Sequence, residues 1–456
     1  MNTKLAFVLV LFALLSSLLL MRLYPIEVKA PNSHRVHNLD TALNYTTIQE
    51  AINDVATSNG HTIFVEEGIY YEHVVVGKSL SLVGENQYST IIDGNGTDTV
   101  VHVTADSVTI RRFSIKNGSI GIHIDNSSGS LISENSIIDN YGDAVLIDYS
   151  TNCNVYSNVV GNNTDRGILV TETQNFIISG NTVYGSKEMY GINANSSTNG
   201  LIARNNVYEN AFDGIGIVSS SICTVVANNV NDNPLYGIYI DESSDSFIYH
   251  NNIVNNSIQA AVTNSTIHWD DGIEGNYWSD YNGTDADQNG IGDSPYNIFE
   301  GGGLYADSLP LMGRFSGFKT SFEYQVNIIS NSSVSNFGFY LVNSSYAALT
   351  FNVRGEIGSQ GFCRLRIPKV LINGSYNVRF DGIIVTYPQV RELQPSNETF
   401  EYLYINYAHS DHVIEISGTT TIPELSPLTM IVFLMVATLF AIMIYRRKPP
   451  FVHLKN

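Results

Sequence analysis

Cysteine, tryptophan and basic residues are all scarce in this chain of 456 residues. It has three cysteines, two tryptophans, and 23 lysines and arginines against 43 aspartates and glutamates. An odd, small number of cysteines argues against a disulfide framework as the source of stability. The formal net charge of −20 argues against nucleic acid and anionic lipid headgroups as partners, because like charges repel.

The N-terminal end carries one of two long apolar runs. Lys4 precedes an apolar stretch over residues 5–21, and a polar stretch then reaches the small residue Ala30. This order is typical of a secretory signal peptide, which we expect over residues 1–30. The alternative is an uncleaved membrane anchor, because Pro31 is an unfavourable context for cleavage.

The second long apolar run lies near the C-terminus. Residues 428–445 form 18 residues without a charge, and Arg446, Arg447 and Lys448 follow at once. This length and the flanking cations predict a transmembrane helix with residues 446–456 as a cytoplasmic tail. We therefore expect an extracellular ectodomain that is anchored at the cell surface by a single C-terminal helix. Its 13 Asn-X-Ser/Thr sequons are candidate glycan sites.

Asparagine is abundant, and it repeats. One column of asparagines advances in steps of 23, 23, 24, 23 and 23 residues: Asn135, Asn158, Asn181, Asn205, Asn228 and Asn251. A second asparagine follows each of these five residues later, except at Ser186. Columns of β-branched and small residues keep the same step. A fixed step of this length predicts a repeat architecture in which each coil is one unit.

Each repeat contains short runs of β-branched residues between Asn, Gly and Ser corners, which predicts strands joined by turns. One repeat cannot bury its own apolar face, so neighbouring coils must stack. The sequence therefore predicts an all-β fold, a right-handed parallel β-helix over residues 38–265. A capping sequence at residues 47–52 predicts an N-terminal helical cap. A leucine-rich repeat is the alternative with this period, but leucine is scarce between residues 120 and 260.

The repeated asparagines have a predicted structural role. At a corner, each side-chain amide can enter the coil and bond to the amides one coil above and below, which satisfies a buried polar line. Asparagine also tolerates the left-handed backbone of a sharp corner. Cys153 and Cys223 share a column three coils apart, or roughly 14 Å, which is beyond disulfide reach, so we expect free thiols.

Several segments of the chain resemble a known group. The stretches TIQEAI, IFVEEGIYYE and KSLSLVG, together with the Asn/Gly coils, resemble right-handed β-helix proteins of the pectin-lyase-like superfamily. Within it they are similar to the NosD-like periplasmic and surface proteins, common in archaea, of the carbohydrate-binding and sugar-hydrolase group. The resemblance covers roughly residues 38–312. It implies the fold, and it implies activity only weakly.

Catalytic signatures of that superfamily are incomplete here. Residues 163–165 match the first polygalacturonase motif, but nothing suitable follows. Residues 68–72 match a Gly-x-Tyr-x-Glu pattern that we interpret as structural. Asp125 and Asp148 would lie on adjacent coils as a candidate surface acid pair for acid/base chemistry or a metal, with solvated surface acids as the alternative. The histidines form no recognisable ligand cluster, and we interpret His123, His250 and His268 as surface residues.

One segment predicts a cation site. Oxygen ligands at positions 1, 3, 5, 7 and 9 of a loop, with glycine at position 6, are typical of Ca²⁺ binding. The candidate ligands are Asp285, Asp287, Asn289, the backbone carbonyl of Ile291, and Asp293. Position 12 is Tyr296 rather than glutamate, so Asp280 or Asp307 would have to supply the bidentate ligand. We expect a structural calcium ion in a module over residues 266–312 that closes the β-helix.

Residues 315–418 alternate apolar and polar side chains, which predicts a small antiparallel β-sandwich between the β-helix and the anchor. Together these features predict a non-enzymatic surface protein that binds polysaccharide or a surface-layer partner, or that is structural in the envelope. Tyr141, Tyr190 and Tyr236 are candidate platforms for sugar rings. The alternatives are a polysaccharide-active enzyme (a lyase, hydrolase or epimerase) and a periplasmic metal-insertion accessory protein.

Overall fold

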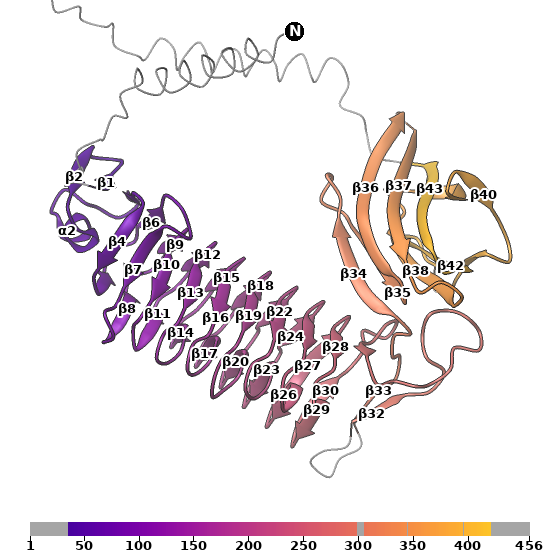
Figure 1. The fold of residues 1–456 in the computed structure, drawn as a ribbon, viewed down its shortest axis with the longest axis horizontal. Helices are drawn as coiled ribbons and strands as arrows, with labels where there is room; N and C mark the ends of the chain where they lie inside the picture. The colour runs from indigo at the N-terminus through magenta and orange to yellow at the C-terminus, as the bar shows by residue number, and fades with distance from the viewer. Residues whose placement is uncertain (1–34, 299–304, 344, 395, 421–456) are drawn as a thin grey trace, which may run out of the picture.

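The computed structural model describes residues 35–298, 305–343, 345–394 and 396–420 (Figure 1). The signal peptide expected over residues 1–30, the transmembrane helix over 428–445 and the tail over 446–456 lie outside the described residues. None of the helices in the described ranges is long and apolar enough to cross a membrane.

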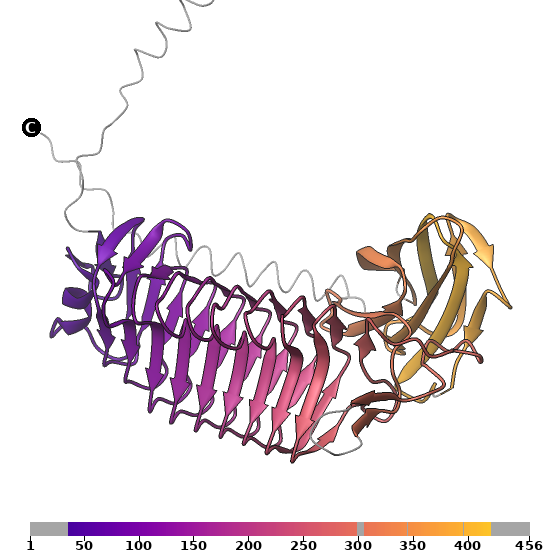
Figure 2. The same cartoon turned by 60° about the horizontal axis from the view of Figure 1, so that its bottom comes forward.

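Three sheets run along a stack of coils, as Figure 2 shows. Sheet A contains, in spatial order, β2 (Leu43–Tyr45), β1 (Val36–Asn38), β3 (Thr62–Val65), β6 (Ser81–Gly84), β9 (Thr109–Arg111), β12 (Leu131–Ser133), β15 (Asn154–Tyr156), β18 (Ile177–Ser179), β21 (Leu201–Ala203), β24 (Thr224–Val226), β27 (Ser244–Tyr249) and β30 (Thr266–His268). Sheet B contains β4 (Gly68–Tyr71), β7 (Thr90–Asp93), β10 (Ser114–Lys116), β13 (Ser136–Ile138), β16 (Val159–Gly161), β19 (Thr182–Tyr184), β22 (Asn206–Tyr208), β25 (Asn229–Asn231), β28 (Asn252–Val254) and β31 (Tyr277–Trp278). Sheet C contains β5 (Val74–Val76), β8 (Thr99–Val103), β11 (Ile120–Asp125), β14 (Val145–Asp148), β17 (Ile168–Thr171), β20 (Ile192–Asn195), β23 (Ile215–Val218), β26 (Tyr236–Asp241) and β29 (Ile258–Thr263).

Neighbouring coils pair in parallel in all three sheets. The exceptions to this regular pattern lie at the ends of sheet A, where β1 pairs antiparallel with β2 and β3 and the register shifts between β27 and β30. In sheet A, for example, Val155 lies beside Ile178, and Ile178 lies beside Ile202. These inward β-branched side chains are fully buried, so one continuous apolar core runs along the stack. The predicted all-β parallel β-helix is therefore confirmed. Its three sheets follow from the repeat, because identical steps place like residues over like residues.

The left-handed corners differ from the prediction. The residue before each asparagine of the first column, rather than the asparagine itself, takes the positive φ, between 52° and 67°: Glu134, Ser157, Gly180, Arg204, Ala227 and His250. This residue turns the chain from sheet A towards sheet B, and the asparagine that follows then points into the coil. The expectation that asparagine is selected here for its left-handed backbone was wrong, because its role lies in the side chain.

The column of asparagines forms one buried chain of hydrogen bonds. In each case Nδ2 and the backbone N–H donate to the Oδ1 of the asparagine on the next coil, with N–O distances of 2.9–3.1 Å. The chain continues beyond Asn251 to Asn276, which the sequence pattern missed because this step is 25 residues long. It ends at the buried Asp307, whose Oδ2 accepts from the backbone N–H and Nδ2 of Asn276 at 2.7 and 3.3 Å.

Helix α2 (Ile48–Asn53) lies against the first coil. Its start carries the expected capping box, in which Thr47 and Glu50 bond to each other's backbone N–H. The two carboxylate oxygens of Glu72 accept from the first two N–H groups of the helix, both at 2.9 Å. The Gly-x-Tyr-x-Glu match thus has a structural use here, since its glutamate fixes the start of the helix. The apolar side of the helix is buried in the core of the coils.

The C-terminal part contains antiparallel strands. A two-stranded sheet of β32 (Tyr296–Ile298) and β33 (Tyr305–Asp307) follows the last coil. A five-stranded sheet then contains β34 (Arg314–Lys319), β35 (Gln325–Ser330), β38 (Gln360–Pro368), β42 (Phe400–Ala408) and β41 (Val390–Glu392). The other five-stranded sheet contains β36 (Ser333–Asn343), β37 (Tyr346–Arg354), β43 (Asp411–Thr419), β39 (Asn373–Phe380) and β40 (Ile383–Val385). Both sheets contribute to one buried core.

All three cysteines are buried free thiols, as expected for Cys153 and Cys223. Burial raises the pKa of Cys223 and of Cys363 to about 11. These thiols therefore remain protonated at neutral pH and pack as small core groups.

Candidate functional site

The outward face of sheet C carries neighbouring histidine and aspartate side chains. Successive side chains of a strand alternate between its two faces, so Ile122 and Ile124 point inward and are buried, while His123 and Asp125 share the outward face. The parallel register then places His102 beside His123, and Asp125 beside Asp148.

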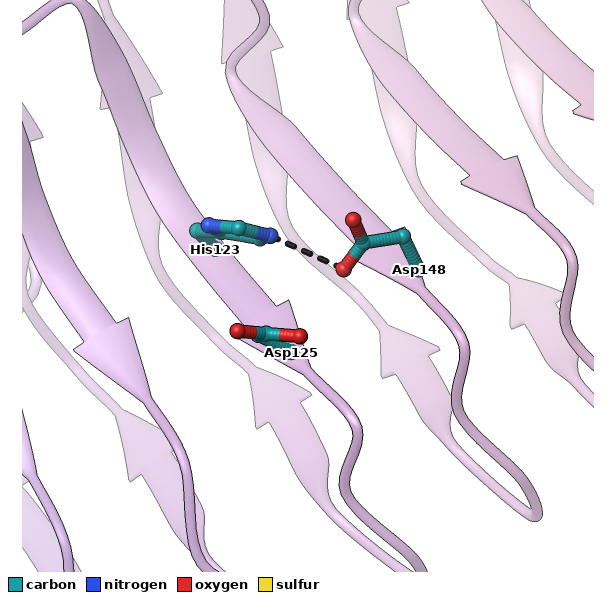
Figure 3. Close-up of side chains that lie close together, drawn as sticks. All are labelled: His123, Asp125 and Asp148. Carbon is teal, nitrogen blue, oxygen red and sulfur yellow. Dashed lines mark hydrogen bonds and ion pairs between the residues drawn. The ribbon is translucent and has the colours of Figure 1, made fainter.

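Figure 3 shows how His123, Asp125 and Asp148 converge. The distance from His123 Nε2 to Asp148 Oδ1 is 2.9 Å, a hydrogen bond. His102 Nε2 lies 3.6 Å from Asp125 Oδ2, which is an ion-pair distance rather than a hydrogen bond. The two imidazole rings stack with centroids 4.9 Å apart and planes 8° apart. Four residues from three neighbouring strands thus form one cluster, which we name the His–Asp cluster.

The structure places the acid pair as the register predicted and corrects the interpretation of the histidines. Asp125 and Asp148 lie on adjacent coils, but each faces a histidine. The expectation of no ligand cluster considered only pairs of histidines, and it missed that the donor atom of His123 lies within 4.8 Å of those of Asp125 and Asp148. His250, expected at the surface, is buried against Glu274, whereas His268 is exposed as expected.

The His–Asp cluster has the donor types of a metal site. Donor atoms of His123, Asp125 and Asp148 all lie within 4.8 Å of one another, and they form the only such group of three among the described histidines, cysteines and acids. Two imidazole nitrogens and two carboxylates suit borderline divalent ions such as Zn²⁺ and Cu²⁺. A histidine hydrogen-bonded to a carboxylate, as His123 is, can also relay protons.

The predicted calcium ligands lie in a loop between β31 and β32. Both carboxylate oxygens of Asp285 accept backbone N–H bonds from within the loop, at 2.8 and 2.9 Å. Asn289 Oδ1 and Asp293 Oδ2 accept similar bonds. Asp287 is exposed, and the backbone of Ile291 lies in the same loop with its side chain buried. These oxygens therefore lie on one loop, though its carboxylates do not converge as closely as those of the His–Asp cluster.

The two acids proposed to complete that loop have other partners. Asp307 ends the asparagine chain, and its Oδ2 also accepts from Trp278 Nε1 at 2.8 Å. Burial raises the pKa of Asp307 to about 6, against the lowering effect of its N–H donors. Asp280 Oδ2 accepts from the Tyr296 hydroxyl at 3.1 Å.

A second polar feature runs along the edge of sheet C, at the position just before each coil's small residue. Successive coils place Asp143, Arg166, Tyr190, Asp213 and Tyr236 there, in register. The two aspartates are buried, while the arginine and the tyrosines are half-exposed. We name Arg166, Tyr190 and Tyr236 the edge row. Tyr141 lies at the same corner and is 60% exposed, two positions earlier in its coil.

The buried aspartates hold the backbone of the edge row. Asp143 Oδ1 accepts from the backbone N–H of Arg166 at 3.0 Å and pairs with its guanidinium at 3.4 Å. Asp213 Oδ1 accepts from the backbone N–H of Tyr236 at 3.1 Å. Burial raises the pKa of Asp213 to about 6.

Glycine shapes the surface beside Tyr190. A Cβ at Gly216 would lie 2.6 Å from Tyr190 Cε1, so only glycine lets this ring lie over the strand. Desolvation raises the pKa of Tyr190 to about 12, which keeps its hydroxyl protonated as a donor. Tyr236 stacks on Tyr239, with centroids 5.4 Å apart and planes 14° apart. The edge row thus presents aromatic rings that are fixed in place before any ligand arrives.

Comparison with known proteins gives a family and a partial relative. The model of the NosD family, described as "Periplasmic copper-binding protein (NosD)", matches residues 52–283. A "Cell surface glycoprotein" of Methanothermus fervidus is 32% identical over 157 residues, which is 32% of this chain and 26% of that protein. The chain thus spans about a quarter of the length of this curated relative.

Solved structures match this chain at low similarity. The A-module of the mannuronan C-5 epimerase AlgE4 of Azotobacter vinelandii is 20% identical with a TM-score of 0.41, over 48% of this chain and 76% of that one. A tailspike capsular polysaccharide depolymerase of an Acinetobacter baumannii bacteriophage is 9% identical with a TM-score of 0.32, over 82% of each chain.

The family description names copper, and the donor groups of this chain show which oxidation state of copper they suit. Cys153, Cys223 and Cys363 are buried in the cores, so no thiolate is available at the surface of the described chain for Cu⁺. The imidazoles and carboxylates of the His–Asp cluster are half-exposed and fit Cu²⁺ as well as Zn²⁺.

Proposed function

The chain belongs to the NosD family, and from that membership and the geometry of sheet C we propose that it is a non-enzymatic cell-surface protein that binds a neutral polysaccharide. The family description and the name of the Methanothermus fervidus relative support a location outside the cytoplasm. We propose further that residues 428–445 anchor the ectodomain in the membrane and that the C-terminal sheets act as a spacer.

The edge row carries the polysaccharide proposal. Tyr190 and Tyr236 occupy the same position two coils apart, and Arg166 occupies it one coil before Tyr190. Each coil advances about 4.8 Å, close to the length of one sugar unit in an extended glycan. Tyrosine rings present flat apolar faces on which sugar rings can stack.

The net charge of the protein narrows the class of polysaccharide that it can bind. A net charge of −20 disfavours an anionic glycan, because the field of the whole protein repels it. Asp143 and Asp213 are buried beneath the edge row and accept from its backbone, so the half-exposed tyrosines and Arg166 form the surface at this edge. Neutral hydroxyl-rich chains match this surface.

A glycan array followed by calorimetric titration with the purified full-length protein tests the proposal. We expect Tyr190→Ala and Tyr236→Ala each to weaken binding of the selected glycan about tenfold, because each removes one stacking platform. Tyr156→Ala is the matched control, since Tyr156 is 40% exposed on sheet A and should leave binding unchanged.

Two outcomes would contradict the proposal. Equal effects of Tyr190→Ala and Tyr156→Ala would remove the edge row as the site. Release of reducing sugar by the wild-type protein, lost in Asp125→Asn or Asp148→Asn, would show a polysaccharide-active enzyme instead.

We also propose that the loop from Asp285 to Asp293 binds a structural Ca²⁺ ion. Its oxygen side chains and backbone carbonyls lie within nine residues, and Gly290 has the positive φ of 87° that a tight loop needs. The loop also contacts the C-terminal sheets, because Arg364 Nη1 donates to the carbonyl of Asn289 at 2.9 Å. A bound ion would therefore hold the end of the β-helix and the following sheet together.

Adding millimolar Ca²⁺ should raise the Tm by at least about 2 °C, because an ion that binds only the folded state stabilises it. Differential scanning calorimetry before and after excess chelator measures the shift. The double variant Asp285→Asn/Asp287→Asn should abolish it, whereas Asp125→Asn should retain it. An unchanged wild-type Tm would rule the ion out.

A further inference from the structure

We propose that His102, His123, Asp125 and Asp148 together bind one divalent transition-metal ion of the Zn²⁺ or Cu²⁺ class. This site is separate from the edge row and from the Asp285–Asp293 loop, so it does not depend on either proposal above. The inference rests on the positions of the donor atoms, on one partnerless nitrogen and on the rigidity of the strands that carry the four residues.

The donor atoms are close enough to share one ion. Zinc and copper take imidazole nitrogens and carboxylate oxygens at about 2.0–2.2 Å, which puts neighbouring donors roughly 3–4 Å apart. His123 Nε2 and Asp148 Oδ1 are 2.9 Å apart, and His102 Nε2 and Asp125 Oδ2 are 3.6 Å apart. The donors of His123, Asp125 and Asp148 all fall within 4.8 Å. These three donors can therefore share one ion. His102 lies outside this group of three, so its ring must tilt away from its stack on His123 for Nε2 to reach the same ion.

One nitrogen of the His–Asp cluster has no hydrogen-bond partner. His102 Nε2 is buried from solvent and makes no hydrogen bond, although it points towards Asp125. Buried polar nitrogens are almost always bonded, so an unmet one needs an explanation. A simple structural pair accounts for His123 and Asp148, but it leaves His102 unexplained. An ion between the two histidines and the two acids would give His102 Nε2 a partner.

The backbone fixes these side chains before an ion binds. Each residue lies within β8, β11 or β14, whose inward neighbours are fully or almost fully buried in the core. Sites built on strands hold ligand geometry better than sites on mobile loops. All four side chains nevertheless remain partly exposed, with 18–42% of each accessible, so an ion can reach them from solvent.

The donor chemistry selects the class of ion. Imidazole nitrogens disfavour Ca²⁺ and Mg²⁺, which prefer oxygen alone. The absence of sulfur from the four residues disfavours Cu⁺. Two nitrogens with two oxygens fit tetrahedral Zn²⁺ or tetragonal Cu²⁺. The negative charges of the two carboxylates also offset the positive charge of the ion.

The test is a titration of the full-length protein with Zn²⁺ alone, followed by Cu²⁺ with electron paramagnetic resonance. Millimolar Ca²⁺ is present throughout to occupy oxygen-only sites. We expect one ion per chain, and superhyperfine splitting from two imidazole nitrogens on Cu²⁺. His123→Gln, His102→Gln and Asp148→Asn should each weaken binding by at least about tenfold, and either histidine variant should leave one coordinated nitrogen.

His268→Gln is the matched control, because His268 is exposed on β30 of sheet A and should not affect binding. Circular dichroism and the metal-free Tm show whether each variant is folded, and the near-isosteric Asp148→Asn keeps the test valid if a histidine variant unfolds. No stoichiometric binding, equal losses in His123→Gln and His268→Gln, or a Cu²⁺ spectrum without nitrogen splitting would each overturn the proposal. Glycan binding measured with chelator present shows whether the edge row works without the ion.

Discussion

Replacing Asn205 with alanine should lower the free energy of unfolding by about 3–5 kcal/mol, because it breaks the asparagine chain in its middle. Asn205 Oδ1 accepts from the backbone N–H and Nδ2 of Asn181, and its own Nδ2 donates to the carbonyl of Ile178 and to Asn228 Oδ1. Alanine would leave the Asn181 N–H and the Ile178 carbonyl buried without these partners. Each such group costs about 1–3 kcal/mol.

Equilibrium urea unfolding, followed by far-UV circular dichroism, measures the loss. Asn206→Ala is the control, since Asn206 is the next residue in the chain and its side chain lies half-exposed on the other side of strand β22. We expect Asn206→Ala to change the free energy of unfolding by less than about 0.5 kcal/mol. Equal effects of the two substitutions would mean that buried asparagines stabilise the coils no more than surface ones do.

The same chain of asparagines shows which parts of the fold are readable from the sequence. A constant step makes equivalent residues visible as columns, so the β-helix and six asparagines of the chain follow from periodicity alone. Asn276 falls outside because an insertion lengthens the last coil, and Asp307 falls outside because a carboxylate replaces the amide as the final acceptor. Periodicity therefore predicts the regular coils but not the ends of the stack. There, the last polar group needs a hydrogen-bond partner from outside the repeat.

The sequence likewise predicted one part of the His–Asp cluster and missed another. The register predicted that Asp125 and Asp148 lie side by side, since both belong to regular coils. His102 lies in the coil before the columns begin, and its distance from His123 is 21 residues rather than 23. Its contact with Asp125 therefore had no signal in the aligned columns. Arg166 was missed for another reason, because an isolated arginine in an acidic chain is usually a solvated surface charge.

A buried ion triad between the last coil and the C-terminal sheet had no sequence signal at all, because 90 residues separate two of its members. Glu274 Oε1 accepts from Arg364 Nε at 2.6 Å, and its Oε2 lies 2.9 Å from His250 Nε2. All three side chains are at most 4% exposed. Arg364 belongs to β38 and His250 lies between β27 and β28, so the triad joins the β-helix to the sheet that follows it.

Arg364→Met should therefore lower the free energy of unfolding by about 3–5 kcal/mol at pH 7, because it leaves the buried Glu274 carboxylate without its guanidinium partner. Arg379→Met is the matched control in the same part of the chain. Arg379 pairs with Glu415 at 2.8 Å, but both side chains are about a third exposed, so its loss should cost less than about 1 kcal/mol. Urea unfolding of both variants at pH 7 compares them, and equal losses would contradict a special role for the triad.

The triad should also give the protein a distinct acid sensitivity. Burial raises the pKa of Glu274, but the bonds and charges of His250 and Arg364 outweigh it and hold the pKa at about 2, against an ordinary value of 4.5. Below pH 4.5 the unfolded chain takes up a proton at Glu274 that the folded chain does not. The stabilisation is thus complete above pH 4.5 and is lost as the pH falls towards 2, by about 3 kcal/mol in total.

The double variant Glu274→Leu/Arg364→Met separates this effect from the general acid unfolding of a protein rich in carboxylates. It removes both buried charges, so it should recover much of the stability that Arg364→Met loses at pH 7. Between pH 5 and 2.5 its free energy of unfolding should fall by about 2 kcal/mol less than that of the wild type, because the proton uptake at Glu274 is gone. If the free energy of unfolding fell by the same amount in both proteins over this pH range, Glu274 would not be held ionised by its partners.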